Sequence, residues 1–207
     1  MRPLKCARSA GTLPARLLMT DAARVAEPAT DIARLKPGDA VIVRDYSRLE
    51  RAAHARALKR LCRQRRLLLL VAGDAQLARA IGADGLHLPE GQVAAPGWRR
   101  FKRSGWLVTA AAHSGAAIAR AFTHGADAVL VSPVFPTASH PRGRALGVCR
   151  FARLARASRL PVYALGGISA ATLRQLSGLP IAGIAGISGV AGIRLPRRNP
   201  RRNPMRR

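Results

Sequence analysis

Hydroxyl groups, a histidine and two arginines gather in one short segment, Ser132–Arg144. It reads Ser-Pro-Val-Phe-Pro-Thr and continues Ala-Ser-His-Pro-Arg-Gly-Arg. Hydroxyl and backbone N–H donors close to a strand end, with cations farther out, suit the binding of a diphosphate group. We therefore expect an anion-binding loop here, and the alternative is an ordinary crossover with exposed cations.

Two glycine turns could supply further anion donors. Gly166 and Gly167 precede Ser169, and Ser188 precedes Gly189. Glycine lets backbone N–H groups approach an anion closely, and a serine can open a helix whose first N–H groups point at that anion. A Gly-Gly pair alone is weak evidence, but two such turns at this interval favour a phosphate site.

These residues need elements that bring them together, and the chain offers eight apolar, β-branched runs. They are continuously apolar, as expected for parallel strands covered on both faces. The expected strands are Arg16–Asp21, Ala40–Asp45, Leu67–Ala72, Gly85–Leu88, Trp106–Ala111, Ala128–Val134, Pro161–Gly166 and Ile181–Ile187.

Stretches with helical spacing alternate with these strands. They are Leu49–Cys62, Asp74–Ile81, Ser114–His124 and Ser169–Leu176, and the last three begin on a typical N-cap residue. Alternation up to eight strands predicts an α/β fold, a single (β/α)8 TIM barrel over residues 13–193. A doubly wound open sheet would need a glycine-rich loop after its first strand, which is absent. The eighth outer helix is missing or vestigial, so we expect that side to be exposed or covered by a neighbouring chain in a homo-oligomer.

The charge is unusually positive, with 36 Lys plus Arg against 10 Asp plus Glu and a formal net charge of +26. Such a field attracts phosphates and, in principle, nucleic acid. The arginines are scattered, however, and aromatic residues are too sparse for base stacking, which argues against nucleic acid. Residues 194–207 form a basic, proline-containing block that we expect to be a disordered tail.

The remaining composition favours a cytoplasmic protein. Cys6, Cys62 and Cys149 are widely spaced and form no CxxC pair, which argues against a disulfide framework or a zinc site. No apolar run is long enough to span a membrane, and no apolar run follows the basic start as in a secretory signal.

Three segments carry a family resemblance. Gly82-Ala-Asp-Gly-Leu-His-Leu88, Gly125-Ala-Asp through Thr137, and Gly166-Gly-Ile168 resemble successive signatures of the thiamine-phosphate synthases and the related TenI-like thiazole tautomerases. The resemblance runs in order from about Leu13 to Val190. It implies a thiamine-biosynthesis transferase that joins hydroxymethylpyrimidine diphosphate to thiazole phosphate and releases pyrophosphate with Mg²⁺.

The resemblance also implies roles for individual residues. Arg44 matches the arginine that meets the diphosphate, and His140 stands where the family has a catalytic-loop lysine. His113 matches the histidine that the tautomerases use as an acid–base catalyst. The hydroxyl pair corresponds to Thr137 and Ser139, and the thiazole-phosphate cradle to Gly167, Ile187 and Ser188, with Gly166 as a further phosphate-binding residue.

The chain departs from the family pattern at the metal acids. Ala72-Gly73 stands where an Asn-Asp pair would supply one magnesium ligand, and Gln92 replaces the second acid. Asp74 and Glu90 are the nearby candidates for metal ligands, and Mg²⁺ needs charged oxygen ligands. Two further differences are Tyr46 in place of a lysine and Ala111 in place of a serine.

The sequence leaves three functions open. The first is the synthase reaction on small phosphorylated substrates. The second is a metal-independent tautomerase that uses His113, because that reaction has no diphosphate leaving group and would lose little with the magnesium acids. The third is a non-catalytic barrel that binds a phosphorylated ligand.

Overall fold

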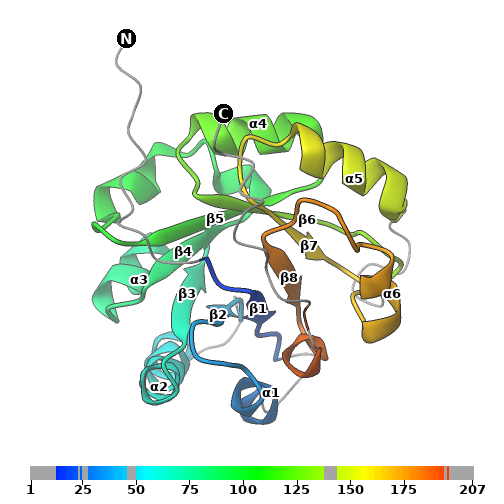
Figure 1. Ribbon diagram of the computed structural model, residues 1–207. Helices are drawn as coiled ribbons and strands as arrows, with labels where there is room; N and C mark the ends of the chain where they lie inside the picture. The colour runs from blue at the N-terminus through cyan, green and yellow to red at the C-terminus, as the bar shows by residue number, and fades with distance from the viewer. Residues whose placement is uncertain are drawn as a thin grey trace.

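In the computed structural model the described residues are 13–22, 24, 28–45, 50–137, 144–193 and 195. Eight parallel strands pair in chain order and close between the first and the last into a barrel, which confirms the predicted (β/α)8 fold (Figure 1). The strands are β1 (Arg16–Met19), β2 (Ala40–Val43), β3 (Leu68–Ala72), β4 (Gly85–Leu88), β5 (Leu107–Ala112), β6 (Ala128–Val131), β7 (Val162–Leu165) and β8 (Gly183–Gly186).

Side chains of each strand alternate between two apolar environments. On β2, Ala40 and Ile42 join a cluster built from strand and strand-end residues, whereas Val41 and Val43 pack with helix residues such as Ile32 and Leu58. The first cluster fills the barrel and the second lies beneath the outer helices. Because both faces are buried, the strands are mainly apolar and do not alternate between apolar and polar residues.

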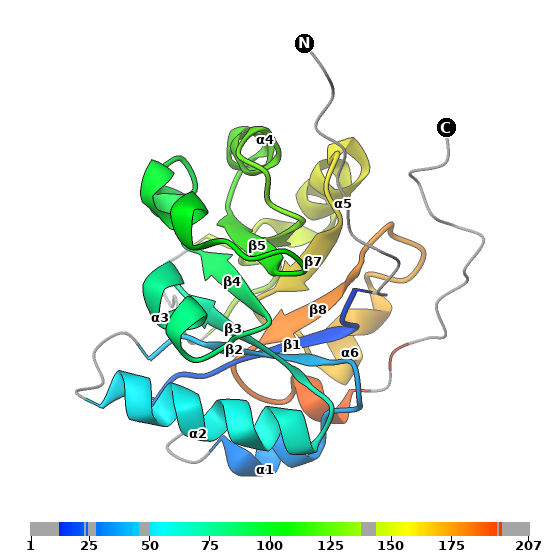
Figure 2. The ribbon, with the colours of Figure 1, turned by 90° about the vertical axis from the view of Figure 1, so that its left-hand side faces the viewer.

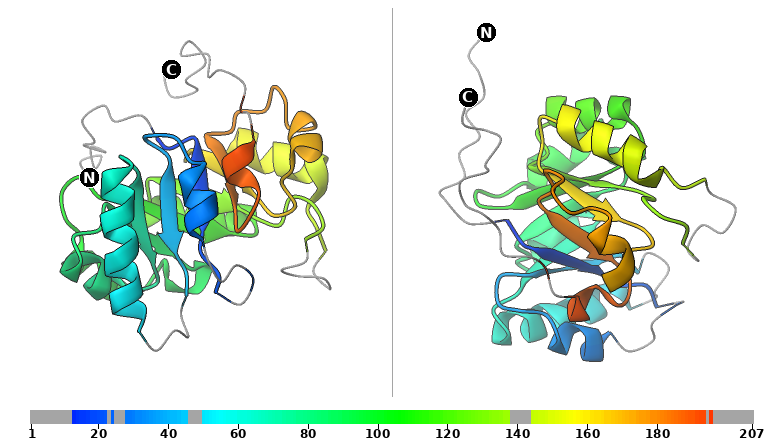
Figure 3. Two further views of the ribbon diagram at one scale, coloured as in Figure 1. Left: turned by 90° about the horizontal axis from the view of Figure 1, so that it is seen from below. Right: turned by 45° about the vertical axis from the view of Figure 1, so that its right-hand side comes forward.

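Helices surround the barrel in all views (Figures 1 and 3). The α-helices are α1 (Ala29–Ala33), α2 (Arg51–Gln64), α3 (Ala75–Ala80), α4 (Gly115–Thr123), α5 (Gly147–Ala157) and α6 (Ala170–Arg174). The predicted N-caps are confirmed, since Asp74, Ser114 and Ser169 each accept a backbone N–H three residues on. Among the described residues, none of the helices is long and apolar enough to cross a membrane.

Short 3-10 turns replace two of the outer helices. The β4–β5 connection holds η1 (Glu90–Gln92) and η2 (Pro96–Phe101), and β8 is followed by η3 (Val190–Gly192). Figure 3 shows η3, in orange-red, beside α1, where Val190 and Ala191 share a core cluster with Ile32. Within the described part of the chain, the eighth outer helix is therefore reduced to one turn, as predicted. The predicted basic tail, apart from Leu195, lies outside the described residues.

A buried ion pair ties the ends of the barrel sequence together. Arg16 Nη1 donates to Asp39 Oδ2 at 3.1 Å, which links β1 to the start of β2. Its Nη2 donates to the Ile193 carbonyl oxygen at 2.8 Å, beyond η3. Both charged residues are less than a tenth exposed, so this pair is insulated from solvent screening.

Candidate active site

All strands run in one direction, so their carboxyl ends, and the predicted functional residues that follow them, gather at one end of the barrel (Figure 2). The α-helices that follow the strands begin at this end. Five of the strands, β1, β2, β6, β7 and β8, stop before the predicted carboxyl end. For example, β6 stops at Val131, before Ser132 and Pro133. Proline has no N–H for the ladder, and the residues beyond it turn toward the next strand.

Arg44 follows β2 and is held by the neighbouring strand end. Its guanidinium donates to the Asp21 carboxylate, and its backbone N–H donates to Thr20 Oγ1 at 3.0 Å. Thr20 donates in turn to the buried Asp45 carboxylate at 2.5 Å. The Arg44 side chain is partly exposed, so its cation is fixed in direction and open to an incoming anion.

Asp74 follows β3, and each of its carboxylate oxygens has a partner. Its Oδ1 accepts the Leu77 N–H at 2.8 Å as the cap of α3, and its Oδ2 lies 3.5 Å from Arg51 Nη1. The other terminal nitrogen of Arg51 donates to the Ala72 carbonyl at the end of β3. The arginine thus occupies the end of β3 from the first turn of α2.

Glu90 and His113 meet between β4 and β5. Glu90 Oε1 accepts from Arg120 Nη2 at 3.1 Å, and Oε2 accepts the His113 backbone N–H at 3.1 Å. The His113 ring has Nδ1 2.7 Å from the Ser132 carbonyl oxygen, so Nδ1–H donates to it. Its Nε2 lies 4.0 Å from Glu90 Oε2, and the side chain is 55% exposed. Such an anchored, accessible imidazole can accept and return a proton.

The described part of the segment after β6, residues 132–137, is called the hydroxyl loop, and it packs against the first glycine turn, Gly166-Gly167. Val134 N–H donates to the Leu165 carbonyl at 2.9 Å, and Phe135 N–H donates to the Gly166 carbonyl at 3.1 Å. A Cβ on Gly167 would stand 2.6 Å from both Phe135 Cβ and the Pro136 carbonyl oxygen. Thr137, next in the chain, is therefore placed close to this turn, whereas Ser139 and His140 lie outside the described residues.

The second glycine turn follows β8. Ile187 is half-buried and Ser188 is exposed, and Gly189 turns the chain into η3 with a φ of +75°. Ser169 and Thr172 form a capping box behind the first turn, and Thr172 Oγ1 donates to the Gly167 carbonyl at 2.9 Å. Because β7 and β8 are paired, the two turns are neighbours at the same end of the barrel.

His87 is a buried titratable group below this site. It lies on β4 with Nδ1 2.9 Å from Thr109 Oγ1. Burial, and secondarily the positive charge of Arg44, lowers the pKa of His87 to about 4 from 6.5. The imidazole is therefore neutral in the folded protein at physiological pH.

We expect His87 to make the protein sensitive to acid. A depressed pKa in the folded state means that the stability contributed above pH 6.5 is lost as the pH falls toward 4, by about 3 kcal/mol in total. Denaturant unfolding at several pH values should show this loss in the native protein and a smaller loss in His87→Asn. Parallel curves for the two proteins would contradict the assignment.

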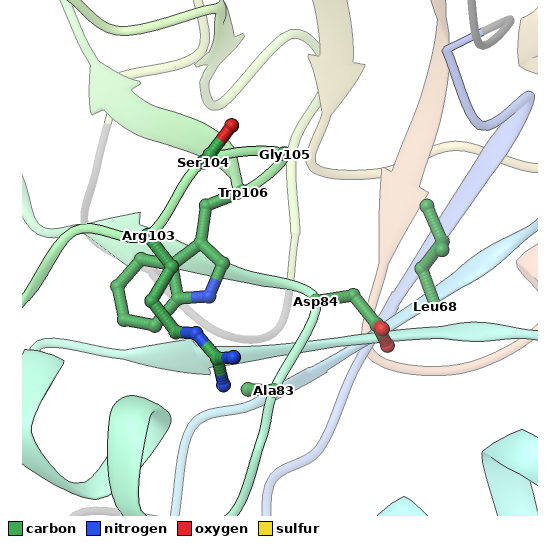
Figure 4. A pocket seen from close by; sticks show the side chains of 7 residues that line it. All are labelled: Leu68, Ala83, Asp84, Arg103, Ser104, Gly105 and Trp106. Atoms are coloured by element: carbon green, nitrogen blue, oxygen red, sulfur yellow. The ribbon is translucent and has the colours of Figure 1, made fainter.

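A separate cavity of about 250 Å³ lies at the opposite end of the barrel (Figure 4). In the figure, Arg103 and Trp106 lie together on one side of it and Leu68 on the other. Its lining residues precede β3, β4 and β5 or begin them: Leu68, Ala83, Asp84, Arg103, Ser104, Gly105 and Trp106. It therefore contains none of the predicted site residues.

Comparison with known proteins decides between families that share this barrel. The family model described as thiamine monophosphate synthase matches residues 18–190. The chain belongs to this family. A thiamine-phosphate synthase from Methanoculleus marisnigri is 34% identical over 169 residues, covering 79% of the chain and 80% of the relative.

Two further relatives agree with this placement. A putative thiamine-phosphate synthase 2 from Aquifex aeolicus is 35% identical over 56% of the chain, and the match spans 61% of that protein's length. A solved structure of a thiamine phosphate pyrophosphorylase from Pyrococcus furiosus superposes with a TM-score of 0.69 at 25% identity, covering 87% of this chain and 88% of that one.

The family's magnesium chemistry can be tested against the donors that are present. The described residues contain no group of three or more His, Cys, Asp or Glu side chains arranged to hold a metal ion. All four carboxylate oxygens of Asp74 and Glu90 accept or face N–H groups, and each carboxylate has an arginine beside it. As they stand, these residues do not fit a divalent cation, which requires oxygen ligands in a negative environment.

The motifs of the family did not reveal Arg51 and Arg120, because both arginines reach the strand ends from helices. The position of Arg51 near the site could nevertheless have been predicted from the expected fold. A helix that follows a strand in this barrel starts at the site end, so a cation in its first turn lies near the neighbouring strand.

Proposed function

We propose that this protein joins hydroxymethylpyrimidine diphosphate to thiazole phosphate and releases pyrophosphate. One observation carries the proposal: the 132–137 segment is hydrogen-bonded to the Gly166-Gly167 turn, at the barrel end that also bears Arg44. Donors for two anionic groups thereby converge from loops that the sequence separates. Membership of the thiamine monophosphate synthase family supports the same reaction.

The chemistry needs binding and charge stabilisation more than proton transfer. The carbon–oxygen bond to the diphosphate breaks with its electron pair on the leaving group, and the thiazole nitrogen donates its pair to the pyrimidine methylene carbon. Arg44 would meet the diphosphate, and Thr137, with Ser139, would donate hydroxyl hydrogen bonds. Backbone N–H groups near Gly167 and Ser188 would hold the thiazole phosphate. Fixed donors of this kind stabilise charge as it develops.

The direct test is product formation. Full-length protein with both substrates, across magnesium concentrations from a chelated buffer to an excess, should yield thiamine phosphate detectable by chromatography. A folded protein that forms no product at any magnesium concentration would contradict the proposal. The family reaction also implies a cytoplasmic setting, with which the free thiols of Cys62 and Cys149 are consistent.

The anchored, exposed ring of His113 favours a second candidate, a thiazole tautomerase without a metal. In that reaction Nε2 takes a proton from the thiazole precursor and returns one at another ring position. The Ser132 carbonyl holds Nδ1–H and so keeps Nε2 free to accept. Glu90 would stabilise the imidazolium that forms.

Two variants separate the candidates. For a synthase, Arg44→Gln should lower kcat/KM about tenfold, because a charge-assisted contact to the diphosphate is lost, and His113→Ala should matter less. For a tautomerase, His113→Ala should lower kcat/KM about a hundredfold or more, with Arg44→Gln tolerated. Steady-state assays of both reactions on both variants decide. A barrel that only binds a phosphorylated ligand would catalyse neither.

A further inference from the structure

The end of β3 carries a fixed cation where the family pattern would place a metal acid. Arg51 is the first residue of α2, and its side chain is only 16% exposed. One terminal nitrogen donates to the Ala72 carbonyl oxygen and the other lies 3.5 Å from Asp74 Oδ2. The carbonyl is neutral and Asp74 also caps α3, and these two contacts fix the direction of the guanidinium group.

The second candidate acid is occupied in the same way. Glu90 accepts from Arg120 through one oxygen and from the His113 backbone through the other. A magnesium ion between β3 and β4 would displace these donors and stand close to Arg51, which is of like charge. Such an ion is disfavoured twice, by lost hydrogen bonds and by repulsion.

Arg44 adds a second cation directed at the same end of the barrel. Asp21 anchors its guanidinium group. Its positive charge contributes, after burial, to the lowered pKa of His87 on β4. Both arginines follow β2 in the chain; Arg44 bonds to Asp21 beyond β1, and Arg51 bonds to Ala72 at the end of β3, so the two guanidinium groups flank β2, which pairs with both strands. Planar guanidinium groups bind phosphate oxygens through two N–H groups at once.

We propose that the positive charges of Arg51 and Arg44 stabilise a bound diphosphate in this protein as a divalent cation would, so that the site binds diphosphate without magnesium. The inference rests on the proposed function only for the identity of the anion. It adds that the guanidinium groups are the cations that meet the diphosphate oxygens, with Asp74 and Glu90 serving to orient arginines.

Calorimetric titration of the full chain with inorganic pyrophosphate tests this without any turnover. The dissociation constant should change by less than about twofold between a buffer with chelator and one with excess magnesium. Arg51→Gln should weaken pyrophosphate binding about tenfold in both buffers. The matched control is Arg79→Gln, which removes the same charge from an exposed position in the last turn of α3 and should bind as the native protein does.

Each outcome has a distinct meaning. Binding that requires magnesium overturns the inference and leaves the proposed function standing. Pyrophosphate that fails to bind in either buffer counts against the proposed function itself. Equal affinities for Arg51→Gln and Arg79→Gln would show that Arg51 does not meet the anion. The comparison of buffers on the native chain decides the metal question even if Arg51→Gln does not fold.

Discussion

Replacing Gly167 by alanine should abolish most activity and destabilise the protein by about 2–5 kcal/mol. Gly167 has a φ of +66°, and an added Cβ would stand 2.6 Å from the Pro136 carbonyl oxygen and from Phe135 Cβ. Moving the backbone at Pro136 costs more free energy than moving the end of a flexible side chain, so the hydroxyl loop must shift away from the glycine turn. Displacing binding groups by about 1 Å costs roughly a hundredfold in rate. Thermal unfolding and thiamine phosphate formation measure the two effects.

Gly178→Ala is the matched control for this variant. Gly178 also has a positive φ, +77°, but an added Cβ there would meet nothing within 4 Å. It should therefore show only the backbone strain, about 1–2 kcal/mol, with full activity. If Gly167→Ala behaved like Gly178→Ala, the packing of loop on turn would not position the site.

Arg16→Met should cost about 3–5 kcal/mol of unfolding free energy. The substitution leaves Asp39 buried with its charge uncompensated, although Asp39 keeps backbone N–H groups from Arg16 and Lys36. It also leaves the Ile193 carbonyl without its donor. Urea unfolding at neutral pH measures the loss.

Two comparisons isolate the buried charge as the cause. Adding Asp39→Asn to Arg16→Met should recover at least about 1 kcal/mol, because asparagine can accept hydrogen bonds without a charge. Lys59→Met breaks a more exposed pair with Asp84, 2.7 Å apart, and should cost less than about 1 kcal/mol. An Arg16→Met variant as stable as Lys59→Met would refute the argument.

The sequence predicted the barrel well because burial on both faces leaves a direct trace in residue type. Mainly apolar runs marked all eight strands, and polar caps at Asp74, Ser114 and Ser169 marked three helix starts. The strand ends were less predictable, because backbone hydrogen bonds between neighbouring segments continue past the last residues of regular strand pairing. Leu165 and Gly166, for instance, bond to residues beyond the end of β6.

The site was predicted less completely than the fold. Strand-end positions correctly brought Arg44, Asp74, Glu90 and His113 to one end of the barrel, since parallel strands share that end. What the carboxylates do there depends on arginines from α2 and α4. Whether a long side chain reaches a given carboxylate depends on helix packing, and no local pattern encodes it.

Arg16 links an early part of the chain to a late part through its hydrogen bond to the Ile193 carbonyl, and this affects folding during synthesis on the ribosome. Its acceptor at Ile193 lies 177 residues later, and β1 finds its second neighbour only in β8. Until residue 193 has left the exit tunnel, a cationic side chain and one edge of the first strand lack their final partners. Completion of the barrel therefore follows translation of nearly the whole cylinder, and stalled nascent chains shorter than this should be open to proteases.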